Sequence, residues 1–167
     1  MIVETWETFS LGAVQTRRLG HRLGELAQPG DVYLLVGNLG AGKTCLAQGI
    51  ATGLGVKEAV LSPSFVLIRE HQGRLPFYHV DLYRLEKTAE ISTLGLEDYF
   101  SGDGVCVVEW ADHALPLMPP ERLLVHMRFL SARKRALRFE ATGKRYYHLL
   151  DQLAALSPEA VAIRGQG

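Results

Sequence analysis

Residues 32–50 read VYLLVGNLGAGKTCLAQGI, and this stretch decides the fold. It opens with the short unbroken apolar run 32–36, which is typical of a strand that is buried on both faces of a sheet. The pattern G-x-x-x-x-G-K-T follows directly, and residues 43–54 then favour a helix that glycines end. A buried strand, a glycine loop and a helix in this order predict a phosphate-binding loop of the P-loop type.

The glycine spacing of this loop has a physical reason. Gly37, Gly40 and Gly42 let successive backbone N–H groups turn toward phosphate oxygens, at places where a side chain would clash. We expect Lys43 to reach the β- and γ-phosphates and the Thr44 hydroxyl to be a ligand of Mg²⁺. The alternative is an ordinary glycine turn that caps a helix.

The composition is that of a globular chain with no strong charge. The protein has 167 residues, of which 47% are hydrophobic and 22% charged, so it can bury a core without disulfides. We predict a single P-loop ATPase domain over residues 1–157 and a frayed tail over residues 158–167. Basic and acidic residues number 18 each, so the net charge gives no pull toward nucleic acid.

The sequence also bears on location. The first ten residues contain no basic segment leading into an apolar one, and no run reaches the ~18 apolar residues of a membrane span. Cys45 and Cys106 show no metal-ligand spacing and are interpreted as reduced packing residues. We therefore expect a cytoplasmic protein with no membrane contact.

Apolar runs and turn signals along the rest of the chain predict a strand and a helix before the loop, then a hairpin, further strands and a last helix. The expected ranges are a strand over 2–9, a helix over 11–26, a hairpin of 65–70 and 75–81, short helices within 84–100, strands over 105–110, 121–129 and 136–142, and a helix over 145–156. We therefore predict an α/β, P-loop NTPase-like three-layer fold with a mixed, mainly parallel central sheet flanked by helices.

A nucleotide bound to a P-loop needs a carboxylate near its magnesium ion, and two acidic residues at strand ends are candidates for this role. Glu109 ends the more apolar strand and is predicted to hold the metal, unless it is a strand end paired with a lysine or arginine. Asp81 is predicted to position or activate the attacking water, with capping of the turn over 82–84 or pairing with Arg84 as the alternative. We interpret His79 as a strand residue satisfied by a neighbour.

Three further features allow more than one interpretation. Ser62 or Ser64 could contact phosphate or its metal, or could bond its own backbone in a proline turn. Trp110 is more often a core aromatic than a stacking platform. A basic cluster is interpreted as a solvated face, with a surface for an acidic partner, tRNA or the nucleotide as the alternative; it comprises Arg133, Lys134, Arg135, Arg138, Lys144 and Arg145.

Five segments in this order and at these separations resemble the TsaE family: GNLGAGKT, LSPSF, FYHVDLYRL, ISTLGLEDYF and VVEW. The resemblance runs from about residue 19 to residue 129. It implies a small bacterial ATPase needed for threonylcarbamoyladenosine (t6A) at position 37 of tRNAs that read ANN codons. The family binds the TsaB and TsaD pair, and ATP hydrolysis supports repeated turnover by that complex, so any contact with tRNA is expected through the complex.

The resemblance also implies site residues. Asp81 is the carboxylate tied to hydrolysis and acts with Lys43, while Thr44 and Glu109 hold Mg²⁺ and Trp110 lies beside them. The ATP phosphates are held by Gly37, Asn38, Leu39, Gly40, Ala41, Gly42, Lys43, Thr44 and Cys45.

The chain departs from the family pattern at two places. Leu61 and Cys45 stand where the family often has threonine, which puts a phosphate contact at position 61 in doubt, whereas Ser64 keeps its hydroxyl and is expected to contact the nucleotide. Similarity suggests that adenine rests near residues 9–13 and Arg133.

Two other functions remain open at this stage. A small-molecule P-loop kinase would need an arginine-bearing lid, and no clear lid is visible in the sequence. In a nucleotide-dependent binding module, ATP would shape a docking surface and hydrolysis would be incidental.

Overall fold

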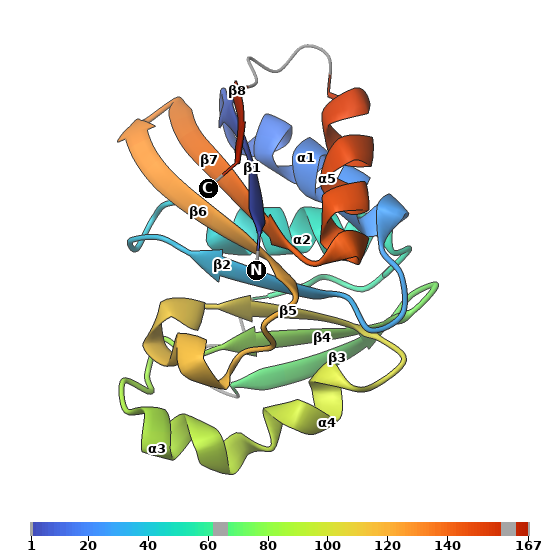
Figure 1. The fold of residues 1–167 in the computed structure, drawn as a ribbon, viewed down its shortest axis with the longest axis vertical. Coiled ribbons are helices and arrows are strands. Elements are labelled where there is room, and N and C mark those ends of the chain that lie inside the picture. The colour runs from blue at the N-terminus through green and yellow to red at the C-terminus, as the bar shows by residue number, and fades with distance from the viewer. Residues whose placement is uncertain (1, 62–66, 158–162, 167) are drawn as a thin grey trace.

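The structure is a computed structural model that describes residues 2–61, 67–157 and 163–166. These residues form one mixed sheet between two layers of helices (Figure 1). The strands are β1 (Val3–Ser10), β2 (Val32–Val36), β3 (Ile68–Gln72), β4 (Pro76–Asp81), β5 (Val105–Glu109), β6 (Arg122–Ser131), β7 (Lys134–Thr142) and β8 (Ile163–Gln166). The helices are α1 (Ala13–Leu26), α2 (Lys43–Gly53), α3 (Thr88–Ile91), α4 (Leu96–Phe100) and α5 (Lys144–Ala155), with 3₁₀ helices η1 (Ser92–Leu94) and η2 (Ala111–Leu117).

The eight described strands lie in the order β3-β4-β5-β2-β6-β7-β1-β8. The α/β fold with a mixed sheet flanked by helices is confirmed, but "mainly parallel" fits only its centre. The neighbours β4, β5, β2 and β6 pair in parallel, whereas the outer pairings are antiparallel. Tight turns join β3 to β4 and β6 to β7, and such turns connect antiparallel neighbours.

Alternate residues of β2 support the two helical layers. All five residues of β2 are buried, as predicted for a central strand. Tyr33 and Leu35 face the core under α1, α2 and α5, and Leu34 and Val36 face the core under α3, α4 and η2. The strand that leads into the glycine loop is thus held from both sides.

Helices α1 and α2 pack backbone against backbone. A Cβ atom built on Gly49 of α2 would lie 2.2 Å from the Arg17 carbonyl oxygen, and one on Gly20 of α1 would lie 2.4 Å from the Leu46 carbonyl oxygen. Both distances are far below a van der Waals contact, so only glycine fits at these positions. The helix that carries the glycine loop is therefore fixed closely against α1.

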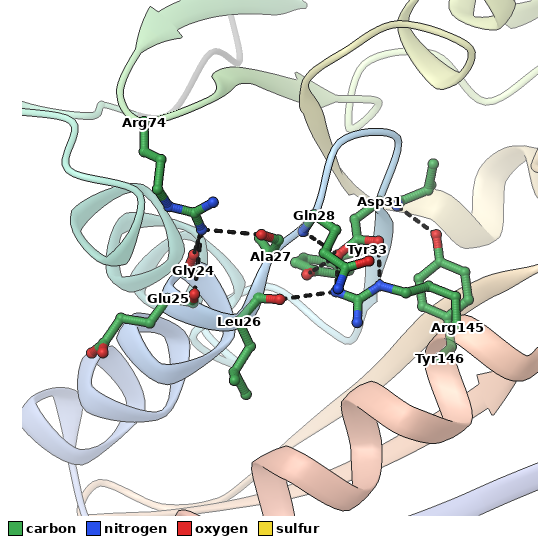
Figure 2. A network of polar contacts seen from close by, with 11 residues as sticks. Gly24, Glu25, Leu26, Ala27, Gln28, Asp31, Tyr33, Arg74, Arg145 and Tyr146 are labelled. Carbon is green, nitrogen blue, oxygen red and sulfur yellow. Dashed lines mark hydrogen bonds and ion pairs between the residues drawn. The ribbon is translucent and has the colours of Figure 1, made fainter.

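A buried ion pair ties the start of β2 to α1 and α5 (Figure 2). The Asp31 carboxylate accepts hydrogen bonds from Arg145 Nε at 2.9 Å and Nη2 at 2.6 Å, and from the Tyr33 hydroxyl at 2.7 Å. Arg145 Nη2 also donates to the carbonyl of Leu26, the last residue of α1, at 2.9 Å. The network joins three elements at the end of the sheet opposite the glycine loop.

The first and last strands, β1 and β8, lie at one edge of the sheet (Figure 1). Strand β8 pairs antiparallel with β1. The prediction that residues 158–167 fray therefore differs from the structure at residues 163–166, which main-chain hydrogen bonds to β1 hold in place. Residues 158–162 lie outside the described residues, and the domain extent of 1–157 stays a prediction. Within the described ranges no helix is both long and apolar enough to cross a membrane.

Candidate functional site

The candidate site lies where three parallel strands end together. The glycine loop follows β2, Asp81 ends β4 and Glu109 ends β5. Asp81 is paired in register with Glu109, and Glu109 with Leu35 of β2. Because the carboxyl ends of parallel strands meet at one edge, both acids lie beside the loop, as the sequence predicted.

The loop has the backbone conformation that its glycines predict. Gly37, Gly40 and Gly42 have positive φ angles of 152°, 81° and 104°. At Gly37 a Cβ atom would also lie 2.3 Å from the Met127 carbonyl oxygen of β6. Helix α2 begins at Lys43, so its first unpaired N–H groups and the positive end of its dipole lie at this loop.

Lys43 lies at the centre of the site. Its ammonium group donates to the carbonyls of Gly37 at 2.5 Å and Asn38 at 2.9 Å, and lies 4.0 Å from the centre of the Trp110 ring. Burial lowers the pKa of Lys43, while the nearby carboxylates of Glu109, Asp112 and Asp81 act against that shift. The site therefore combines one buried cation with three acids, of which Asp112 was not identified from the sequence.

Thr44 and Glu109 are in direct contact. The Thr44 hydroxyl donates to Glu109 Oε1 at 2.9 Å, and Glu109 is 2% exposed. Among the described residues, Glu109 contacts Thr44 and His79 instead of the lysine or arginine that was the alternative. Its other oxygen, Oε2, lies 2.5 Å from His79 Nε2, so the neighbour that satisfies His79 is the candidate metal ligand itself.

The oxygens of Thr44 and Glu109 fit a magnesium ion that also binds phosphate. Mg²⁺ prefers hard oxygen ligands, keeps several waters and is usually bound by one or two protein groups together with substrate phosphates. The described residues include no group of three or more His, Cys, Asp or Glu side chains that could cage a metal. The pair of adjacent oxygens at the start of α2 therefore suits a shared site rather than a closed protein cage.

Asp81 and Trp110 also lie near Lys43. Asp81 is 4% exposed and its Oδ1 accepts a hydrogen bond from the Tyr83 backbone N–H at 2.9 Å, so the turn-capping contact considered from the sequence is present. The half-buried Trp110 ring packs at a tilt against Tyr83 and His113, with ring centres 5.0 and 5.5 Å away. Because it also lies against Lys43, Trp110 is part of the site rather than a plain core aromatic.

The contacts predicted for Ser64 and Arg133 stay predictions. Ser64, like Ser62, lies outside the described residues. Arg133 is exposed in the turn between β6 and β7, where its backbone N–H donates to the Ser131 hydroxyl at 3.3 Å. The basic cluster that contains it is not one surface, since Arg145 reaches inward to Asp31.

A cavity of about 350 Å³ joins the two segments suggested for adenine. Its lining includes Phe9, Leu11 and Lys134, and the Lys134 ammonium group lies 4.3 Å from the Phe9 ring centre. Cys45 Sγ lies 3.5 Å from the Ala13 carbonyl oxygen, which connects this region to the start of α2. The assignment of adenine to this place stays a prediction.

Comparison with known proteins yields one family. The profile described as Threonylcarbamoyl adenosine biosynthesis protein TsaE matches residues 12–137. The tRNA threonylcarbamoyladenosine biosynthesis protein TsaE of Bacillus subtilis (strain 168) is 41% identical over 150 residues, covering 89% of this chain and 92% of that protein. The protein of the same name from Treponema pallidum (strain Nichols) is 38% identical over 122 residues, covering 73% and 90%. The crystal structure of Bacillus subtilis YdiB superposes with a TM-score of 0.82 at 36% identity, covering 93% of this chain and 97% of that one.

Proposed function

Because the chain belongs to the TsaE family of threonylcarbamoyladenosine biosynthesis proteins, we propose that it is a Mg²⁺-dependent ATPase that acts with TsaB and TsaD. The product is t6A at position 37 of tRNAs that read ANN codons, and ATP hydrolysis supports repeated turnover of the complex. The observation that carries the proposal is the 2.9 Å contact between Thr44 and Glu109 directly behind a glycine loop. We further propose that it acts in the cytoplasm and reaches tRNA through its partners.

The loop and Lys43 are assigned to phosphate binding. The N–H groups of residues 37–45 and the N-terminus of α2 favour negative charge, and the Lys43 ammonium group adds a full positive charge beside them. Thr44 and Glu109 supply oxygens for Mg²⁺, which when bound neutralises charge that develops on the phosphate oxygens. Burial of these groups strengthens each of these interactions, because few water molecules screen them.

Asp81 is assigned to the attacking water. Its carboxylate is buried, its backbone lies in register with Glu109, and the Tyr83 N–H fixes one of its oxygens. A carboxylate held in this way can accept a proton from water as the bond to phosphorus forms. We expect slow hydrolysis by the protein alone, because in this proposal TsaB and TsaD complete the productive geometry.

The test is ATP hydrolysis by the full-length protein with TsaB and TsaD. Asp81→Ala should lower the rate about 10²- to 10⁴-fold, as expected for loss of a general base, while nucleotide binding is kept. Lys43→Ala should lose both. Asp103→Ala, which removes an exposed acid in the turn before β5, is the matched control and should have no effect. Equal hydrolysis by Asp81→Ala and the unaltered protein would refute the catalytic role.

The same variants separate hydrolysis from nucleotide-dependent docking. If hydrolysis is required, Asp81→Ala should fail to support repeated modification of tRNA even though it binds ATP. Full modification with Asp81→Ala, together with none for Lys43→Ala, would instead establish a binding module. Binding of each variant to the TsaB and TsaD pair is measured in parallel, so that a docking defect is recognised.

A further inference from the structure

A buried histidine lies behind the carboxylate of the candidate magnesium site. His79 on β4 is 0% exposed, and its Nε2 lies 2.5 Å from Glu109 Oε2 on the neighbouring strand. A carboxylate offers only acceptor atoms, so in this contact Nε2 carries the proton and donates. With Oε1 bonded to the Thr44 hydroxyl, Glu109 is held at both of its oxygens.

The histidine ring is fixed for this one polar contact. Its centre lies 5.7 Å from that of Phe77, two residues earlier on β4, which packs against one of its faces. Among the described residues, Nδ1 has no hydrogen-bond partner. The contact with Glu109 is therefore the polar interaction that the structure provides for this ring, and the ring and the carboxylate restrain each other.

We propose that His79 is a positioning residue that orients Glu109 toward Mg²⁺ at Thr44, an inference that rests on the proposed function. A carboxylate that is free to rotate would spend part of its time with neither oxygen directed at the Thr44 hydroxyl. The hydrogen bond to Oε2 holds the carboxylate plane so that Oε1 stays 2.9 Å from that hydroxyl. Partners of this kind, one step behind a metal ligand, typically change metal affinity by about 10- to 100-fold.

The chain offers a matched control in His71 on the adjacent strand β3. His71 is also buried, its Nδ1 lies 2.5 Å from a carboxylate oxygen, that of Glu58, and its ring packs against the same Phe77 at 5.9 Å. Within the described part of the chain, its hydrogen-bond and ring contacts are with Glu58 and Phe77, which are not assigned to the nucleotide or metal. His71→Leu and His79→Leu therefore remove the same chemistry from the same core region, and only His79 contacts Glu109.

The experiment measures binding of a fluorescent ADP analogue to the full-length variants, first in EDTA and then across a MgCl₂ titration. Affinity in EDTA should be unchanged in both variants, because the loop and Lys43 are intact. The Mg²⁺ concentration for half-maximal tightening should rise about 10- to 100-fold in His79→Leu and stay the same in His71→Leu. His79→Gln, which keeps a donor N–H at the distance of Nε2, should restore the normal requirement, and the shorter His79→Asn should not.

Several outcomes would overturn the inference. A folded His79→Leu protein with the normal Mg²⁺ requirement would do so, as would an equal change in His71→Leu. If His79→Leu fails to fold, the comparison of His79→Gln with His79→Asn decides, and equal requirements in those two refute the role. If the nucleotide affinity of the unaltered protein did not depend on Mg²⁺, the proposed metal site itself would be refuted, and with it this inference.

Discussion

Replacing Arg145 by methionine tests the buried ion pair at the start of β2. Arg145 makes two hydrogen bonds to Asp31, at 2.9 and 2.6 Å, and the side chains are 20% and 3% exposed. Methionine keeps much of the side-chain volume, but among the described residues it leaves the buried Asp31 carboxylate with the Tyr33 hydroxyl and the Gln28 N–H as its remaining donors. Breaking a buried pair in this way costs about 3–5 kcal/mol, and partial solvent access to Arg145 favours the lower end.

Urea unfolding measures this loss. A cost of about 3 kcal/mol is a large fraction of the 5–15 kcal/mol that stabilises a typical domain. With an m-value of about 2 kcal/mol/M, the midpoint should fall by roughly 1.5 M while m is unchanged. Arg138→Met is the control, because the half-exposed Arg138 pairs with Glu7 at 3.8 Å and with Glu140 at 3.5 Å, and such solvent-accessible pairs contribute less than about 1 kcal/mol each. Equal losses in the two variants would refute the reasoning.

Three further predictions concern packing, pH and the site. Gly49→Ala should lower the free energy of unfolding by about 1–3 kcal/mol, measured by thermal unfolding. The added methyl group would clash with the Arg17 carbonyl, and this cost exceeds the gain in helix propensity of about 1 kcal/mol. Unchanged stability would contradict the close packing of α1 and α2. Burial raises the pKa of Tyr146 to about 12 from about 10, so between these pH values the unfolded state releases a proton that the folded state keeps. Stability should fall by about 2 kcal/mol by pH 12, and an equally steep fall in Tyr146→Phe would refute this source. Binding of Mg²⁺ and ADP should change the tryptophan fluorescence, because Trp110 lies beside Lys43. The change should vanish in Trp110→Phe, since the other tryptophan, Trp6, is in the core. A fluorescence change that persists in this variant would contradict the placement of the nucleotide.

The parts of the site that sequence could predict are those fixed by local chain order. The run VYLLV is apolar enough to be a central strand, and the glycines and Lys43 follow it without a gap. An acid at the end of another such strand must lie at the same edge if the two strands are parallel, which is why Glu109 and Asp81 could be chosen. At these strand ends Glu109 contacts Thr44 of the loop and Asp81 contacts Tyr83.

What sequence could not predict depends on register between distant segments. His79 looks like an ordinary strand residue, and its contact with Glu109 follows from the parallel pairing of β4 and β5. Asp31 reads as a turn residue after proline and glycine, and its partner Arg145 is 114 residues away. The residues around Asp31 and those around Arg145 do not predict this contact, because a single sequence does not specify which helix packs on which face of a strand.

The antiparallel share of the sheet was underestimated for a similar reason. The run over residues 122–142 folds back on itself with β6 and β7 joined by a tight turn, and β1 pairs antiparallel with β7. Strand propensity identifies such segments, but their neighbours are chosen by which faces can be buried together. The glycine loop fixed the centre of the sheet and left the order of its outer strands open.

The central claim is tested most directly by threonylcarbamoyl transfer to tRNA, followed over more than one turnover with TsaB, TsaD and ATP. With this protein present, product should continue to form beyond one equivalent of the TsaB and TsaD complex. Without it, or with Lys43→Ala in its place, product should stop near one equivalent. A progress curve that is the same with and without the protein would contradict the account.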